Sequence, residues 1–206
     1  QHAFKTVHSF LSLCQTLLVY QKVSPVLPPV APDIASKTAD LLYVFHRRVH
    51  QLILGAEVTK LLHLKSIPAK TLALCSQVLY AMCELIPYIR ASLHPFMKDP
   101  KHFSNLQQLD KANDDIVSHI EQIFDKFAAI IRERLQAHLG STEAYSAALL
   151  EQSTQTPECS VQMSRFLKEF GSLHRVLGQY LSPEQMTVCH TQNTSVFNHF
   201  LRSEEH

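Results

Sequence analysis

The stretch that decides the fold runs from His102 to Leu139 and reads HFSNLQQLDKANDDIVSHIEQIFDKFAAIIRERLQAHL. Its apolar residues recur at alternating steps of three and four, which places them along one face of an α-helix. The seam consists of Leu106, Leu109, Asn113, Ile116, Ile120, Ile123, Phe127, Ile130 and Arg134, flanked by Val117, Phe124, Ile131, Leu135 and Leu139. A seam this wide predicts a helix that packs against two neighbours. At 1.5 Å per residue the helix would be about 55 Å long, which favours an elongated rod of packed antiparallel helices over a compact globule.

Outward from this helix, the remaining sequence also predicts helices and no strand. Apolar residues at helical spacing mark helices at Ala3–Lys22, Ile34–Leu54, Pro68 to about Leu93, Cys159–Tyr180 and Pro183 to about Leu201, with a helical turn at Glu57–His63. The second of these is expected to bury Ala35, Thr38, Leu41 or Leu42, Phe45, Val49, and Leu52 or Ile53. The predicted fold class is therefore all-α.

Single residues mark where these helices begin, bend and end. Asp33 is expected to cap the second helix, because its carboxylate can accept from the first free amides. Gly55 is the expected stop of that helix, since glycine takes the left-handed conformation without steric cost. Pro87 removes a hydrogen bond inside its helix and predicts a kink. Ser182 and Gln185 have the spacing of a capping box at the start of the last helix.

Two segments interrupt the helical pattern. Residues 24–32 (SPVLPPVAP) are too rich in proline to continue a helix, so we expect an extended Pro-rich connector. Residues 140–157 are rich in Ser, Thr, Ala and Gln and predict a flexible loop. We interpret residues 1–206 as a single elongated helical domain that is a fragment of a longer chain.

Composition excludes several classes of protein. The 206 residues are 46% hydrophobic, and 19 basic against 18 acidic residues leave a formal charge of +1, which argues against a nucleic-acid binder. Four glycines and no tryptophan argue against a β-sandwich or a Gly-rich nucleotide fold. The uninterrupted apolar runs are short, so we expect no transmembrane helix. Five scattered cysteines fit reduced thiols in a cytosolic protein, and Cys75 and Cys83 would lie about 12 Å apart on one helix, too far to bridge.

The sequence contains none of the common catalytic motifs. The sequence holds no P-loop, dinucleotide fingerprint, nucleophile elbow or cysteine-protease signature, so we expect no enzyme, no cofactor and no small-molecule substrate. His46 and His50 in HRRVH have the i, i+4 spacing of a zinc motif. Arg47 stands where the catalytic glutamate of that motif would be, and no third ligand is signalled nearby. Two arginines, Arg47 and Arg48, are also electrostatically unfavourable beside a dication. We therefore expect no metal site, and interpret both histidines as surface or boundary residues.

The charge distribution offers one candidate surface. Between residues 47 and 70, five basic residues stand against one acid, while residues 99–125 hold six acids and two lysines. The five are Arg47, Arg48, Lys60, Lys65 and Lys70. They could complement the acidic helix within the fold, or they could form a surface for anionic lipid headgroups or an acidic partner helix.

Several short motifs carry a family resemblance. They are LILGA at Leu52–Ala56, LK at Leu64–Lys65, K-x-LAL at Lys70–Leu74, IPYIRA at Ile86–Ala91 and, more loosely, DLLYVFHRR from Asp40 and LSPEQM from Leu181. In this order they resemble the C-terminal region of the vacuolar protein sorting-associated protein 54 family, subunits of the Golgi-associated retrograde protein (GARP) complex. The sequence departs from the family pattern at residues 140–157 and ends soon after Leu201, where family members carry further residues.

The resemblance implies a helical bundle of the multisubunit tethering complex type and a non-enzymatic role in endosome-to-trans-Golgi retrograde transport. It implies assembly with other subunits of the tethering complex through a missing N-terminal part. It also implies contact with SNAREs, or with an endosomal membrane or receptor, at the cytosolic face of the trans-Golgi network and endosomes. A helical scaffold or adaptor domain unrelated to tethering is the alternative.

Overall fold

The described part of the chain is entirely helical. A computed structural model describes residues 2–54, 68–139, 161–189 and 191, and these residues contain no strand. The chain divides into two compact units, residues 1–121 and residues 122–206. The all-α prediction is confirmed for the described residues, whereas the elongated rod and the single domain stay predictions.

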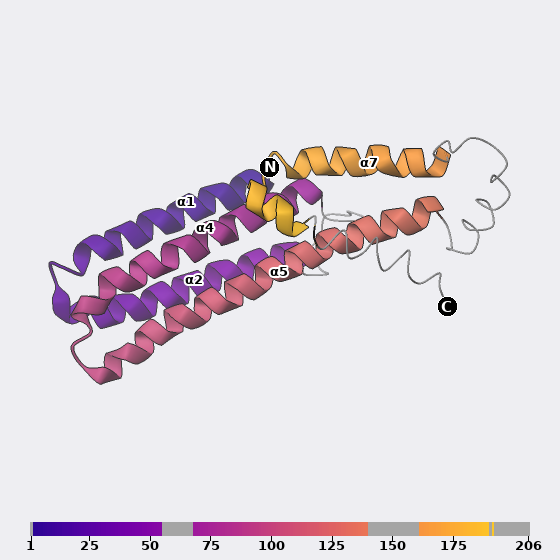
Figure 1. Cartoon of the computed structure of the whole chain (residues 1–206). Coiled ribbons are helices and arrows are strands. Elements are labelled where there is room, and N and C mark those ends of the chain that lie inside the picture. The colour runs from indigo at the N-terminus through magenta and orange to yellow at the C-terminus, as the bar shows by residue number, and fades with distance from the viewer. Residues whose placement is uncertain (1, 55–67, 140–160, 190, 192–206) are drawn as a thin grey trace, which may run out of the picture. The chain divides into compact units, whose positions relative to one another are not determined.

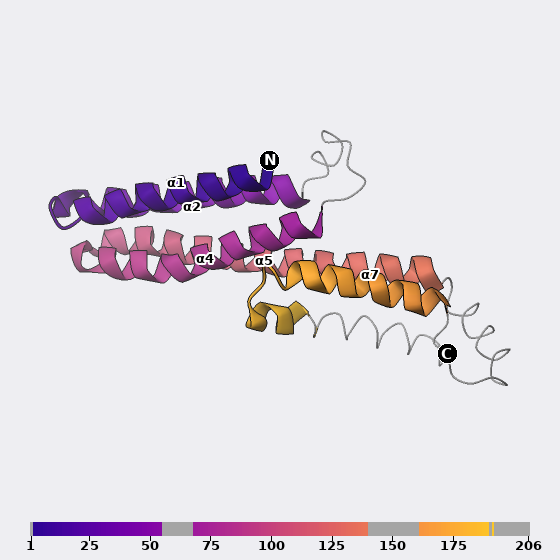
Figure 2. The ribbon, with the colours of Figure 1, turned by 90° about the horizontal axis from the view of Figure 1, so that it is seen from above.

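Unit 1 is a bundle of α1 (His2–Val23), α2 (Ala31–Leu54), α4 (Ala69–Leu93) and the first half of α5 (Phe103–Leu139). Consecutive helices run in opposite directions, so α1 and α4 point one way while α2 and α5 point the other (Figure 1). In the view from above, α1 lies over α2, and α4 lies over the first half of α5 (Figure 2). α4 also contacts both α1 and α2. The predicted antiparallel packing of successive helices is therefore confirmed.

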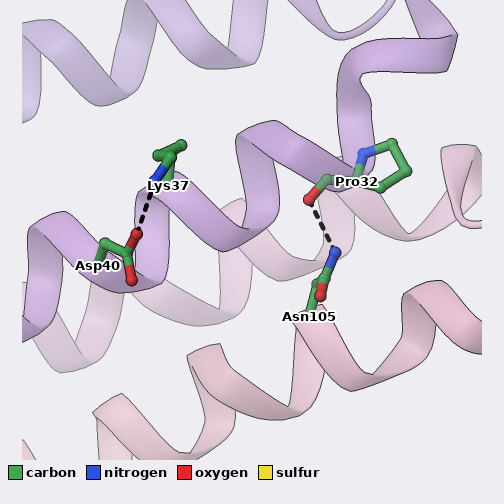
Figure 3. Close-up of polar contacts among 4 residues, drawn as sticks. All are labelled: Pro32, Lys37, Asp40 and Asn105. Carbon is green, nitrogen blue, oxygen red and sulfur yellow. Dashed lines mark hydrogen bonds and ion pairs between the residues drawn. The ribbon is translucent and has the colours of Figure 1, made fainter.

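Polar and aromatic contacts between the helices fix their register. The Phe10 and Phe45 rings of α1 and α2 lie 6.0 Å apart between centroids. The side-chain amide of Asn105 at the start of α5 donates to the carbonyl oxygen of Pro32 at the start of α2, at 2.9 Å (Figure 3). This bond aligns the two parallel helices at their N-terminal ends. By contrast, the nearby Lys37–Asp40 ion pair lies within α2 alone.

The segment between α1 and α2 differs from the expected extended connector. After a turn at residues 24–26 the chain forms a 3₁₀ helix, Pro28–Val30, and α2 begins at Ala31. The prediction of extended structure was wrong because proline suits the first turn of a helix, where no intrahelical partner is needed for its missing N–H. Asp33 is likewise not the cap but lies within the first turn, where its charge favours the helix N-terminus.

Inside unit 1, the buried positions of α2 follow the predicted stripe. Ala35, Thr38, Leu42, Val49 and Ile53 are buried, which decides the two alternatives for Leu42 and Ile53, and Phe45 is half-buried. α4 contributes the largest apolar set, namely Leu72, Ala73, Cys75, Val78, Leu79, Met82, Ile86, Ile89 and Leu93. α4 begins directly after Pro68, which stands at the N-cap position and not within the first turn.

α4 is also the one described helix that is long and apolar enough to cross a membrane, over Ala69–Phe96, with 50% of that window buried within the chain. The sequence prediction of no such helix considered only uninterrupted apolar runs. Scattered polar residues keep those runs short in α4, although the mean hydropathy of the helix is high. Contact with both α1 and α2 accounts for its apolar composition, since a core helix is apolar on most of its surface.

The long helix predicted at residues 102–139 is confirmed as α5, of 37 residues. In unit 1 its seam buries Leu106, Leu109, Ile116 and Ile120, and in unit 2 it buries Ile123, Phe124, Phe127, Ile131 and Leu135. Two expected seam positions differ: Val117 is 42% exposed, and Arg134 faces solvent. Val117 follows a fully buried isoleucine by one residue, so a step of about 100° turns it off the seam.

Unit 2 pairs the second half of α5 with α7 (Val161–Leu177), which is followed by a helix at residues 183–189. Ile131, Leu173, Leu177 and other apolar side chains line a small cavity between these elements. The capping box is confirmed: the Ser182 amide donates to the Gln185 side-chain oxygen at 2.9 Å, and the Gln185 amide donates to the Ser182 hydroxyl at 3.2 Å.

Other sequence predictions fall outside the described residues. They are the Gly55 stop, the turn at residues 57–63, the flexible loop at 140–157 and the last helix beyond residue 191. Pro87 does lie inside α4, and the kink predicted there stays a prediction.

The α5 seam makes a stability prediction. Ile120 is 5% exposed, so Ile120→Gln loses apolar burial and places an amide in the core. We expect the free energy of unfolding to fall by about 2–5 kcal/mol, measured by denaturant unfolding followed by circular dichroism. Val117→Gln on the exposed side of the same helix is the matched control, with an expected change within about 0.5 kcal/mol. Equal effects of the two substitutions would contradict the packing described for α5.

Candidate functional site

The structure describes three of the five basic residues predicted as a partner or lipid surface. Arg47 and Arg48 lie about two turns before the end of α2, and Lys70 is the second residue of α4. All three side chains are exposed. The end of α2 and the start of α4 lie at the same end of unit 1 (Figure 1). Lys60 and Lys65 lie outside the described residues.

Apolar side chains accompany the two arginines on the solvent side of α2. Exposed residues recur there at steps of three and four, so they share one face of the helix. We define the outer face of α2 as Tyr43, Val44, Arg47, Arg48, Gln51 and Leu52, all of which are exposed. Val44 is 64% exposed. Basic and apolar groups therefore alternate over about three turns.

Sequence reasoning identified the arginines of this face and missed its apolar members. The sequence did contain a signal for these apolar members. Val44 and Leu52 lie eight residues apart, which places them on one face of a helix, and Tyr43 directly precedes Val44. The stripe Ala35 to Ile53 accounts for the buried side of α2, so an apolar residue off that stripe has to face elsewhere.

The interpretation that the acidic helix neutralises these basic residues is not supported for Arg47 and Arg48. The ion pair that joins α4 to α5 is made by Arg90, whose Nε lies 2.8 Å from an Asp110 oxygen. Within the described residues, neither Arg47 nor Arg48 pairs with a carboxylate, and the Arg48 guanidinium donates to the Gln51 side chain at 3.4 Å. The charge of the outer face of α2 is therefore left for solvent or for a partner.

The opposite side of α2 carries a second polar group, the histidine trio of His46, His50 and His119. The ring centroids of His46 and His119 are 5.0 Å apart, those of His50 and His119 are 4.6 Å apart, and those of His46 and His50 are 6.3 Å apart. His119 comes from α5 and is 1% exposed, whereas His46 and His50 are half-buried. The trio lies between the two parallel helices of unit 1.

Burial governs the protonation of the trio. Burial, together with the neighbouring His46 and His50, lowers the pKa of His119 to about 3. Burial and His50 also lower the pKa of His46, against the opposing effect of Asp115. His119 is therefore neutral at pH 7. Both of its ring nitrogens, and Nε2 of His46, are buried without a hydrogen-bond partner.

The cysteines of the described residues are free thiols. Burial raises the pKa of Cys75 to about 12, and burial followed by the Glu84 charge raises the pKa of Cys83 to about 11. Because the thiolate is the reactive form, both residues are poor nucleophiles. This supports the expectation that they do not bridge.

These pKa values predict slow thiol modification. At pH 8, the thiolate of Cys75 in the folded chain is roughly a thousand times scarcer than for a cysteine at its ordinary pKa of 9.0. We expect iodoacetamide to leave Cys75 and Cys83 largely unmodified in the folded chain and to modify both in guanidinium chloride. Peptide mass spectrometry reads each site separately. Modification of Cys75 at the same rate in both conditions would contradict its burial in α4.

Fold and surface together define the class of protein. The described residues form two compact all-helical units, and α2 has an exposed face of basic and apolar side chains. A family model described as Vps54-like protein matches residues 1–134, which is more than half of the chain. The chain therefore belongs to the Vps54-like family, and the resemblance noted in its short motifs is confirmed.

Relatives support the same assignment along nearly the whole chain. The chain is 32% identical over 201 residues to vacuolar protein sorting-associated protein 54, chloroplastic, of Arabidopsis thaliana, covering 95% of the chain and 19% of the relative. It is 29% identical over 184 residues to vacuolar protein sorting-associated protein 54 of Mus musculus, covering 89% of the chain and 18% of the relative. The chain thus spans about a fifth of the length of these relatives. No solved structure matches it significantly.

Proposed function

We propose that this chain is a non-enzymatic interaction module of a vesicle-tethering subunit that acts in endosome-to-trans-Golgi retrograde transport. Membership of the Vps54-like family is the observation that carries the proposal. The relatives are named as vacuolar protein sorting-associated proteins, and these names support a role in membrane traffic. In this proposal the protein works as a peripheral membrane protein at the cytosolic face of the trans-Golgi network and endosomes.

In this proposal, the chain and the rest of a longer subunit have different binding roles. The matched relatives are about five times the length of the chain. Other parts of such a subunit would join the sister subunits of the GARP complex and contact SNAREs. The present chain would contribute association with an endosomal membrane or with a receptor on it.

Two properties of the outer face of α2 favour a binding role. Arg47 and Arg48 carry charge that no described carboxylate neutralises, and Tyr43, Val44 and Leu52 expose apolar surface beside them. Basic residues attract an anionic surface, and apolar neighbours add contact area once the surfaces meet. Lys70, with Lys60 and Lys65 in the preceding segment, would extend the same positive charge.

A vesicle assay tests direct lipid contact. We expect the chain to co-sediment with vesicles that contain phosphatidylserine, and the triple variant Arg47→Glu, Arg48→Glu, Lys70→Glu to lose this binding. Each basic residue contributes about 1 kcal/mol near an anionic surface, so the loss should be on the order of 100-fold in the partition coefficient.

The matched control reverses three lysines at the opposite end of unit 1, Lys22→Glu, Lys98→Glu and Lys101→Glu. Both variants change the net charge by the same amount. A difference in vesicle binding between them would therefore come from the location of the basic residues. Equal loss in both would reduce the effect to overall charge and remove the basic residues from the proposal. No binding even by the unaltered chain would exclude direct lipid contact and leave a protein receptor as the partner.

A deletion experiment tests whether the region of this chain is needed for endosomal association but not for assembly with the sister subunits. We expect a full-length subunit that lacks the region of this chain to retain its sister subunits in a pulldown but to lose association with endosomal membranes. Membrane flotation and quantitative mass spectrometry of the captured proteins measure the two properties separately. Unchanged endosomal association after the deletion would contradict the proposal. It would favour the alternative, a helical scaffold or adaptor domain unrelated to tethering.

A further inference from the structure

We propose that His46, His50 and His119 form a binding site for a transition-metal ion of the Zn²⁺ class, held between α2 and α5. The sequence offered the first two residues at i, i+4 spacing but no third ligand. The structure supplies it, since His119 lies 69 residues beyond His50 in the sequence and yet its ring centroid is 4.6 Å from that of His50. Three imidazoles with an open fourth position are a common donor set for zinc.

The spacing of the three rings fits one shared ion. A Zn–N distance of about 2.0–2.1 Å in tetrahedral geometry places the centroids of two bound imidazoles about 5 Å apart. The two separations between α2 and α5, 4.6 and 5.0 Å, are close to this value, whereas the 6.3 Å separation of His46 and His50 within α2 would have to shorten as the rings turn. The rings that face each other from α2 and α5 are therefore close enough to share one ion.

Unsatisfied nitrogens are a second and independent observation. Nδ1 and Nε2 of His119 and Nε2 of His46 are buried without a partner. A buried polar group without a hydrogen bond usually costs about 1–3 kcal/mol, and such groups in folded proteins call for a specific explanation. A metal ion would satisfy a nitrogen on each of these two rings with one ligand.

The charges around the trio come from both helices. Asp115 of α5 acts electrostatically on His46 and stands one turn before His119, so its carboxylate would offset part of the charge of the ion. Arg47 and Arg48 had counted against a metal site in the sequence. Their side chains are exposed on the outer face of α2, about 100° and 200° around the helix from His46.

Binding requires the rings to turn. As the side chains stand, no group of three or more histidine, cysteine, aspartate or glutamate residues among those described is arranged to hold a metal ion. The side-chain torsion that orients an imidazole is broad, so the rings can turn toward a common point without moving the helices. Two of the three side chains are half-buried, so they remain accessible to an ion from solvent.

Titration of the whole chain with Zn²⁺ and Co²⁺ tests the site. We expect one ion per chain with a dissociation constant in the micromolar range or tighter, measured by competition with a chromophoric chelator. Bound Co²⁺ should show the intense visible absorption of four-coordinate geometry. Saturating Zn²⁺ should raise the thermal midpoint, because the ion would bind the folded state alone. A wild-type chain with only the weak absorption of six-coordinate Co²⁺ would overturn the proposal.

Variants separate this site from binding by surface histidines. The double variant His46→Gln, His50→Gln and the control double variant His8→Gln, His94→Gln each remove two of the 13 histidines. We expect the first to lose at least about tenfold in affinity together with the thermal shift, and the control to keep both. Equal affinity in the two variants would show adventitious binding only. If the first variant fails to fold, His50→Gln alone makes the same comparison.

Discussion

Each compact unit of this chain is built on α5, because the apolar seam of that helix has to be covered along its whole length. In unit 1 the first half of the seam is buried where α5 meets α2 and α4, and in unit 2 the second half packs with α7. Burying one large apolar side chain contributes about 1.5–3 kcal/mol. The described ion pairs contribute little by comparison, since the Arg90 and Asp110 side chains are 42% and 49% exposed. Surface charge is thus not needed to hold the fold.

The sequence predicted the helices well because most of their determinants are local. Periodicity located α5 and the buried stripe of α2, and the Ser182–Gln185 capping box depends only on residues three apart. The errors arose where one local pattern permits two structures. Proline excludes a helix interior but favours a first turn, so residues 24–32 were predicted as extended when a 3₁₀ helix and the start of α2 share them.

The site was less predictable because it depends on contacts between distant residues. Charge counting found Arg47 and Arg48 but could not show that Asp110 pairs with Arg90 instead. His119 lay on the predicted seam side, three residues after Ile116, and this was the available signal that it faces another helix. The identity of the helix that His119 faces follows only from the parallel register of α2 and α5. The Asn105–Pro32 bond sets this register, and Pro32 precedes His46, as Asn105 precedes His119, by 14 residues.

The two faces of α2 are therefore linked by one register. If α2 moved by one turn along α5, about 5.4 Å, His46 and His50 would leave His119, and the outer face would be displaced by the same distance relative to the rest of unit 1. Apolar side chains at the interface tolerate alternative pairings better than polar ones do, since they require only volume and burial. The buried histidines and the Asn105 bond to Pro32 distinguish the native register from its neighbours. The Asn105–Pro32 bond and the buried histidines would in this way determine the position of Arg47 and Arg48 on the surface of unit 1.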